Sequence, residues 1–173
     1  QSPKKGEFRA VWDHGGTGFY PGDWERTCKL LADSGINAVF ANMLNDGYAH
    51  YDSKLLHQSE TMRQLGDQIE QCLTAAREFD IEVHIWKVCW KLEGSPPEFI
   101  ERMEKEGRLQ ANAAGEALPW LNPAHPENRK MALESLKEIV GKYDIDGIHL
   151  DYIRYSGPST CCAPFTRRQF QQW

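Results

Sequence analysis

The chain lacks any apolar run of about 18 residues, the length that a membrane-spanning helix requires, so we expect no transmembrane segment. It also lacks an excess of basic residues, because 20 Lys and Arg stand against 25 Asp and Glu and give a net charge of −5. A nucleic-acid-binding surface needs a basic face for the phosphates. The charge balance therefore argues against nucleic acid as a partner.

Cysteine is sparse, and its pattern argues against small folds that are held together by zinc or by disulfide bonds. The five cysteines are Cys28, Cys72, Cys89, Cys161 and Cys162, an odd number without a CxxC pair. A zinc ribbon or a disulfide framework is therefore not expected. Cys28 and Cys72 fall in helical patterns and are predicted to be small buried residues. The adjacent pair Cys161 and Cys162 falls in a loop, and its redox state is open.

Signatures of cofactor binding and of a serine nucleophile are missing as well. Gly15, Gly16 and Gly18 follow the first apolar segment, but their spacing is not GxGxxG and no GK[ST] occurs. A nucleotide site is therefore disfavoured. No GxSxG elbow is present, which disfavours a serine hydrolase. The sequence predicts no cofactor.

What the chain does have is an alternation of two hydrophobic periods. Short apolar segments predict strands over residues 8–13, 36–42, 81–88 and 145–152. Helical spacing predicts helices over about 24–33, 64–79, 98–106 and 127–143, with the tail from 165 to 173 starting another. Repeated strand–helix units imply parallel strands with right-handed crossovers. We therefore expect an α/β fold with the four strands side by side in chain order.

Chemically capable side chains gather where each predicted strand ends, and this distinguishes a closed barrel from an open sheet. They are Trp12, Asp13 and His14; Asn42; His84, Trp86 and Lys87; and His149, Asp151 and Tyr152. Barrel enzymes place their active sites at that face, and a full barrel takes about 250 residues. The sequence thus predicts one domain, the N-terminal half of a TIM-like (β/α)₈ barrel. We expect the remaining strands to follow Trp173, and we interpret the polar start without Met as a trimmed terminus.

Asp151 is the strongest catalytic candidate. Side chains alternate along a strand, so Ile148 and Leu150 are expected to face the helices while His149 and Asp151 face the barrel mouth. A carboxylate at the end of a buried strand is costly unless it is paired or used. Its functional interpretation is nucleophile or general base. The structural alternative is a carboxylate that holds Arg154 or a helix N-terminus.

Aromatic and histidine side chains on the other strands are candidates for substrate binding. Trp86 would provide a platform for a sugar ring and His84 a partner for a hydroxyl, although both also suit a packed barrel core. Trp12 is interpreted in the same two ways, and His149 would contact substrate or Asp151. Further candidate substrate-binding residues are Asn42, Tyr152 and Arg154.

A metal-dependent hydrolase is a competing hypothesis. His84, His149 and Asp151 could converge with His14, and zinc hydrolases use His and carboxylate ligands with one open position. However, no HxH, HExxH or other tight ligand spacing occurs. We therefore assign no metal ligands.

Five blocks of sequence carry a resemblance to a known family. They are Phe8-Arg9-Ala10-Val11-Trp12, Gly35-Ile36-Asn37-Ala38-Val39-Phe40, Glu82-Val83-His84-Ile85-Trp86, Trp120-Leu121-Asn122-Pro123, and the stretch from Asp146 to Tyr155, DGIHLDYIRY. In this order they resemble the glycosyl-hydrolase-like family 10 proteins of bacteria, over about residues 7 to 155. The resemblance places the family's strand-end Asp on Asp151 and its third-strand His on His84.

The resemblance implies a TIM-like barrel that is exported to the periplasm or cell surface, often as a lipoprotein, and that hydrolyses a glycan. We expect a glycoside hydrolase acting on a polysaccharide or a peptidoglycan-type glycan through two carboxylates. A non-catalytic glycan-binding barrel is the main alternative. The acid/base partner of Asp151 is expected from the later strands, so residues 1–173 alone are predicted to be inactive and prone to self-association.

Overall fold

The computed structural model describes residues 6–173, so all but the last residue of the polar start discussed above lies outside the described residues. The elements in chain order are β1 (Ala10–Asp13), α1 (Trp24–Asp33), β2 (Ala38–Leu44), α2 (Glu60–Leu65), α3 (Gln68–Glu78), β3 (Glu82–Val88), α4 (Pro97–Lys105), β4 (Leu109–Ala111), β5 (Ala117–Leu121), α5 (Pro126–Lys142), β6 (Gly147–Asp151) and α6 (Pro164–Gln172). Within residues 6–173, no helix is both long and apolar enough to cross a membrane.

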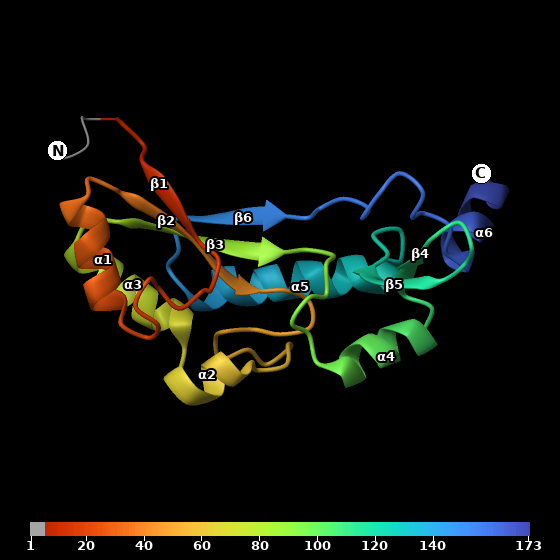
Figure 1. Ribbon diagram of the computed structural model, residues 1–173, viewed down its shortest axis with the longest axis horizontal. Helices are drawn as coiled ribbons and strands as arrows, with labels where there is room; N and C mark the ends of the chain where they lie inside the picture. Colours follow the sequence, from red (N-terminus) through yellow and green to blue (C-terminus); the bar gives the residue numbers. More distant parts are fainter. Residues whose placement is uncertain (1–5) are drawn as a thin grey trace.

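The main sheet has four parallel strands in the order β1-β2-β3-β6 (Figure 1). This confirms the predicted order, because β6 is the fourth strand of the predicted series. The register aligns Phe40 with His84, and Trp86 with both Asn42 and His149. Side chains on one face of a strand therefore lie beside side chains on the same face of the neighbouring strand.

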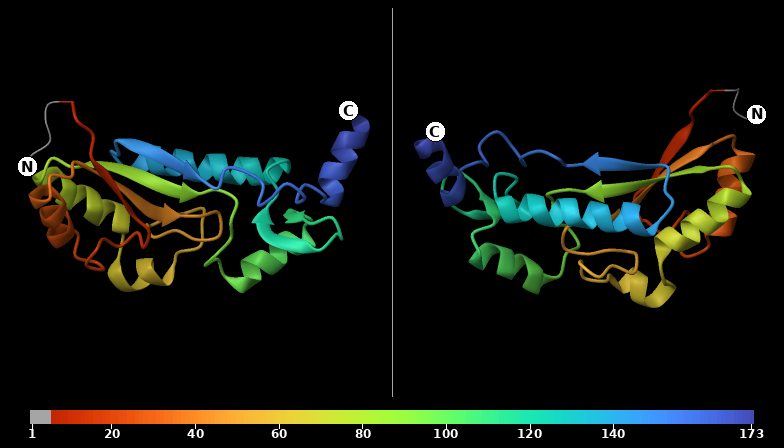
Figure 2. Two further views of the ribbon diagram at one scale, coloured as in Figure 1. Left: turned by 45° about the horizontal axis from the view of Figure 1, so that its top comes forward. Right: turned by 180° about the vertical axis from the view of Figure 1, so that it is seen from behind.

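The helices cover one face of this sheet (Figure 2). Val39 and Ala41 of β2, with Val83 and Ile85 of β3, are almost fully buried against residues of α1, α3 and α5. The helical partners in this core include Cys28, Leu31, Ile69, Cys72 and Ile139. The burial of Cys28 and Cys72 confirms their prediction as core residues.

The opposite face of the sheet is aromatic, and no described helix covers it (Figures 1 and 2). Phe8 is 54% exposed and Trp12 is 50% exposed. Trp12 stacks on Phe40 with ring centroids 5.5 Å apart, and the Phe40 ring lies 4.7 Å from that of His84. In a closed barrel this face forms the interior, where side chains from facing strands fill the space.

Two parts of the fold differ from the expected elements. The helix predicted over 64–79 is two helices, because Gly66 adopts a left-handed conformation with φ of 81° and Asp67 caps the next helix. The sequence analysis predicted no element between α4 and α5, but this segment contains the antiparallel pair β4–β5. A three-residue strand carries too little periodicity to be recognised in a sequence.

Parallel strands in chain order, with helices on one face only, are the architecture of half a (β/α)₈ barrel. In an open doubly wound sheet the helices cover both faces, and the strand order reverses at a switch point. Neither feature occurs in the described sheet. The carboxyl ends of β1, β2, β3 and β6 therefore define the edge at which a barrel of this kind carries its site.

Candidate functional site

A pocket of about 380 Å³ opens at the carboxyl ends of the four parallel strands. We call it the Asp151 pocket. Its lining residues are His14, Asn42, Asn45, Tyr48, Trp86, Val88, Lys91, Glu93, Gly94, Asp151 and Tyr152. Each parallel strand, or the loop that follows it, contributes at least one of them. The four strands thus bring together residues that are up to 138 positions apart in the chain.

Asp151 ends β6, and its half-buried carboxylate lines the pocket. Its Oδ1 accepts a hydrogen bond of 2.7 Å from the backbone N–H of Tyr152. No other hydrogen bond or ion pair reaches this carboxylate from residues 6–173. Arg154 donates instead to the Tyr155 carbonyl. The structural alternative, in which Asp151 holds Arg154 or a helix N-terminus, therefore finds no support.

Tyr152 has an unusual backbone conformation next to Asp151. Its φ of 50° lies in the left-handed region, which costs free energy in a bulky residue. The ring is held edge-to-face by Trp120, with centroids 5.2 Å apart, and the Lys91 ammonium lies 5.3 Å from its centre. This conformation places the Tyr152 N–H on Asp151. Backbone outliers that surrounding contacts hold in place often occur at functional sites.

Trp86 and Asn42 are paired across β2 and β3. Trp86 is 6% exposed, and neither its Nε1 nor the Oδ1 of Asn42 has a hydrogen-bond partner among the described residues. One is a donor and the other an acceptor, and both residues line the pocket. Buried polar atoms without partners are rare in native proteins and call for an explanation.

His14 packs edge-on against the Trp86 ring at 4.7 Å and forms part of the pocket wall. The loop that carries it is fixed by the buried Asp13, which accepts hydrogen bonds from the N–H groups of Gly15 and Gly18. Gly16 has φ of 63°, and a Cβ there would overlap the Asn42 carbonyl. Asp13 is thus a turn residue, whereas His14, which the sequence analysis considered as a possible metal ligand, lines the pocket.

Two loops form the remaining wall, and Asn45 joins them. Its Oδ1 accepts hydrogen bonds from the N–H groups of Gly47 and Tyr48, and its Nδ2 donates to the Glu93 carbonyl. Burial, followed by the charge of Glu93, raises the pKa of Tyr48. Lys91 and Glu93 form an ion pair at the rim, and the hydrogen bond that Lys91 donates to Glu93 raises the pKa of Lys91.

Several candidate residues lie outside the pocket. His84 occupies a deeper layer of the sheet, with its Nε2 3.3 Å from Glu82 and its Nδ1 facing Gly147. Residues two positions apart on a strand are separated by about 6.6 Å, so His84 and Trp86 share a face but not a pocket. The structure therefore does not bring His84 together with Asp151 in this pocket, contrary to the expectation.

His149 is half-buried and does not line the pocket. Its ring lies 5.9 Å from Trp86 and 5.1 Å from Phe40, both edge-to-face. Trp12 is likewise part of the aromatic face, and Arg154 lies with its guanidinium 5.0 Å from the Tyr152 ring centre. Within the described chain, no three His, Cys, Asp or Glu side chains are arranged to hold a metal ion. The metal-hydrolase hypothesis therefore gains no geometric support.

The fold and the pocket define a class, a half-barrel with a carboxylate at the carboxyl ends of its strands. The family model of glycosyl hydrolase-like 10 matches residues 8–173. The chain belongs to that family.

Solved structures agree with this fold. A hypothetical protein from Ruminiclostridium thermocellum is 22% identical, with a TM-score of 0.62 over 88% of this chain and 80% of that chain. The maltogenic α-amylase AmyB of Thermotoga neapolitana is 12% identical with a TM-score of 0.56, and this chain is covered to 95% and the amylase to 43%. The α-fucosidase of Thermotoga maritima, in complex with fucose, is 15% identical with a TM-score of 0.51, and the coverage is 75% and 28%. At these identities the likeness shows the fold alone.

A curated relative is 32% identical over 66 residues. It is an S-layer-related protein of Niallia circulans, and the match spans 38% of this chain and 4% of that protein. The chain thus corresponds to a small part of this relative and to less than half of each of the two glycosidases above.

Proposed function

We propose that this chain carries the glycan-binding and nucleophilic half of a glycoside hydrolase, with Asp151 as nucleophile or general base. The observation that carries the proposal is the Asp151 carboxylate, which lines a pocket at the carboxyl ends of the strands and makes a single hydrogen bond to its own chain. Membership in the glycosyl hydrolase-like family supports it. A polysaccharide or a peptidoglycan-type glycan is the proposed substrate class.

The residues around Asp151 suit a sugar. A hydroxyl group can donate to the Asn42 Oδ1 and accept from the Trp86 Nε1–H, which satisfies both buried atoms at once. His14 is exposed and packs edge-on against the Trp86 ring, so a turn of its side chain would open more of that ring to a ligand. Tyr48 and Tyr152 add aromatic surface to the pocket.

The proposed reaction needs two carboxylates. One protonates the leaving oxygen, and Asp151 attacks the anomeric carbon or takes a proton from the attacking water. In retaining enzymes the two groups lie about 5–5.5 Å apart, and in inverting enzymes about 6.5–9.5 Å. Glu93 is the other carboxylate in the pocket lining, but it is ion-paired with Lys91 and mostly exposed. We assign the acid to a later strand of the barrel, outside residues 1–173.

A non-catalytic glycan-binding barrel is the second candidate. The ion pair of Glu93 favours it, since no second carboxylate in the described pocket is free to act as the acid. The S-layer-related relative supports a location at the cell surface for either function.

Turnover and binding assays on the Asp151→Asn and Glu93→Gln variants test the proposal. Peptidoglycan glycan strands, chitooligosaccharides and cello-oligosaccharides serve as substrates, and Asp33→Asn on the exposed side of α1 is the matched control. In a closed barrel, Asp151→Asn should lower kcat about 100-fold to 10,000-fold and leave binding intact, while Glu93→Gln keeps most activity. Turnover that survives Asp151→Asn would remove the catalytic assignment. Binding without turnover in every form of the closed barrel would establish the second candidate.

A further inference from the structure

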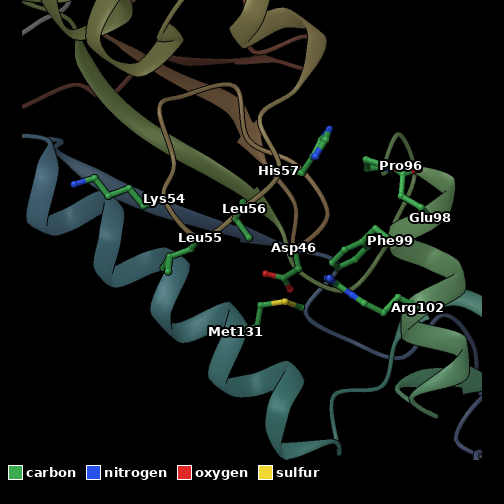
Figure 3. Close-up of a pocket in the computed structure, with 10 residues that line it drawn as sticks. All are labelled: Asp46, Lys54, Leu55, Leu56, His57, Pro96, Glu98, Phe99, Arg102 and Met131. Carbon is green, nitrogen blue, oxygen red and sulfur yellow. The ribbon is translucent and has the colours of Figure 1, made fainter.

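A second cavity lies on the opposite face of the sheet from the Asp151 pocket. Its volume is about 360 Å³, and it lies between the loop after β2 and the helices α4 and α5 (Figure 3). The two cavities share no lining residue. The proposed glycan chemistry therefore makes no use of this second space, which we call the α4–α5 cavity.

The polar end of the α4–α5 cavity is the carboxylate of Asp46, which is 1% exposed. One of its oxygens, Oδ1, pairs with the buried ammonium of Lys87, which also donates to Ser135 of α5. The other oxygen, Oδ2, has no hydrogen-bond partner among the described residues. Because Lys87 already balances the charge, a neutral N–H or O–H group is enough to satisfy Oδ2.

Arg102 supplies the opposite kind of group. It projects from α4 toward Asp46 (Figure 3), with its guanidinium 5.2 Å from the centre of the Phe99 ring. No carboxylate within residues 6–173 pairs with it. Lys54 adds a second positive charge to the cavity lining and Glu98 one negative charge. A planar guanidinium without a partner is well suited to bind a carboxylate through a bidentate pair of hydrogen bonds.

The walls between these two polar ends are apolar. Leu55, Leu56, Phe99 and Met131 line the cavity together with Pro96. A ligand therefore needs an apolar body, one hydrogen-bond donor and one negatively charged group. A neutral sugar has neither a charge nor an apolar body, so this cavity is not suited to a second subsite for a neutral glycan.

We propose that the α4–α5 cavity binds an N-acylated amino acid with an apolar side chain and a free carboxylate, as at the end of a short peptide. The amide N–H donates to Asp46, the carboxylate pairs with Arg102, and the side chain packs on Leu56 and Phe99. Oδ2 is covered in the unliganded protein. The unbranched side chain of Met131, which points toward Asp46 in Figure 3, turns aside when the ligand enters.

The test is a ¹H–¹⁵N NMR titration of the protein with N-acetyl-leucine, with calorimetry for the affinity. We expect saturable shifts at residues of the α4–α5 cavity and none at Asp151. N-acetyl-leucinamide, which lacks the carboxylate, and inorganic phosphate, which lacks the amide and the side chain, should each bind at least about tenfold more weakly. Equal binding of phosphate would reduce the cavity to a general anion site and overturn the proposal.

Two variants separate the ligand contact from folding. Arg102→Gln should weaken N-acetyl-leucine at least about tenfold, whereas the control Arg168→Gln on α6 should not change it. Both variants should keep the thermal unfolding midpoint of the parent, because no described residue forms an ion pair with Arg102. A lowered midpoint for Arg102→Gln with unchanged affinity would show that Arg102 closes on Asp46 instead. That result, or no saturable binding, would refute the site.

Discussion

The buried ion pair of Lys87 and Asp46 gives the sharpest stability prediction. Both side chains are fully buried between the sheet and α5, and Lys87 also donates to Ser135. Replacing Lys87 with Met keeps an unbranched side chain of nearly the same length but leaves Asp46 as a buried carboxylate without its counter-charge. Breaking a buried pair in this way costs about 3–5 kcal/mol of unfolding free energy. A domain has about 5–15 kcal/mol in total, so the variant should be severely destabilised.

The same variant should show a diagnostic pH dependence. Burial raises the pKa of Asp46 in the folded protein, and Lys87 opposes this shift. Without Lys87 the folded pKa rises further above the unfolded value of about 4. The protonated form is then favoured in the folded state, so stability is fully present below the unfolded pKa and is lost as the pH rises through the folded pKa. We expect Lys87→Met to be least destabilised near pH 4.

Urea unfolding of four proteins measures the effect: the parent, Lys87→Met, the double variant Lys87→Met/Asp46→Leu, and Lys130→Met on the exposed side of α5 as control. The double variant should recover most of the loss, because an apolar pair replaces the charges. A loss for Lys87→Met no larger than that of Lys130→Met would refute the reasoning. It would mean that water reaches the pair.

Three further predictions follow from other parts of the structure. Burial lowers the pKa of His50 to about 4, so the unfolding free energy should fall by roughly 3 kcal/mol as the pH drops from 6.5 to 4; acid titration of stability should show this loss, and His50→Gln should remove most of it. Gly16→Ala should lower the unfolding free energy, measured by chemical denaturation, by at least about 2 kcal/mol, because φ is positive there and the new Cβ would overlap the Asn42 carbonyl. The control Gly107→Ala, at an exposed position that also has a positive φ but open space around it, should lower it by about 1 kcal/mol. Residues 1–173 alone should associate through the open aromatic face and release no sugar, which light scattering and a glycan assay would check; an active monomer would contradict both expectations.

Much of the fold could be predicted from the sequence because the strands are short, apolar and regularly separated by helices. The alternation of side chains placed Asp151 and Trp86 on one face and Lys87 on the other. The alternation of side chains along a strand shows which face a residue is on but not how far it lies from the end of the strand. His84 was therefore grouped with the pocket residues, although it lies one layer below Trp86. Depth depends on the stagger between strands, which is a property of the sheet as a whole.

The features that the sequence analysis missed depend on contacts between distant segments. The pairing of Asp46 with Lys87, 41 positions later, depends on the loop after β2, which brings Asp46 beneath the sheet. The short pair β4–β5 is likewise stabilised by its partner strand rather than by local preference. His14 was named at a strand end but not as a substrate-binding residue, although it directly follows a buried strand end and three glycines come after it.

The most direct test of the account is an oligosaccharide titration that maps where a glycan binds. Chitooligosaccharide is added to the ¹⁵N-labelled protein and to Trp86→Ala, Asp151→Asn and Trp173→Ala, the last an exposed control. The account predicts shifts around Asn42, Trp86 and Asp151, at least about tenfold weaker binding for Trp86→Ala, and little change for the other two. Binding of Trp86→Ala that matches the Trp173→Ala control, or shifts confined to other surfaces, would contradict the assignment of the Asp151 pocket as the glycan site.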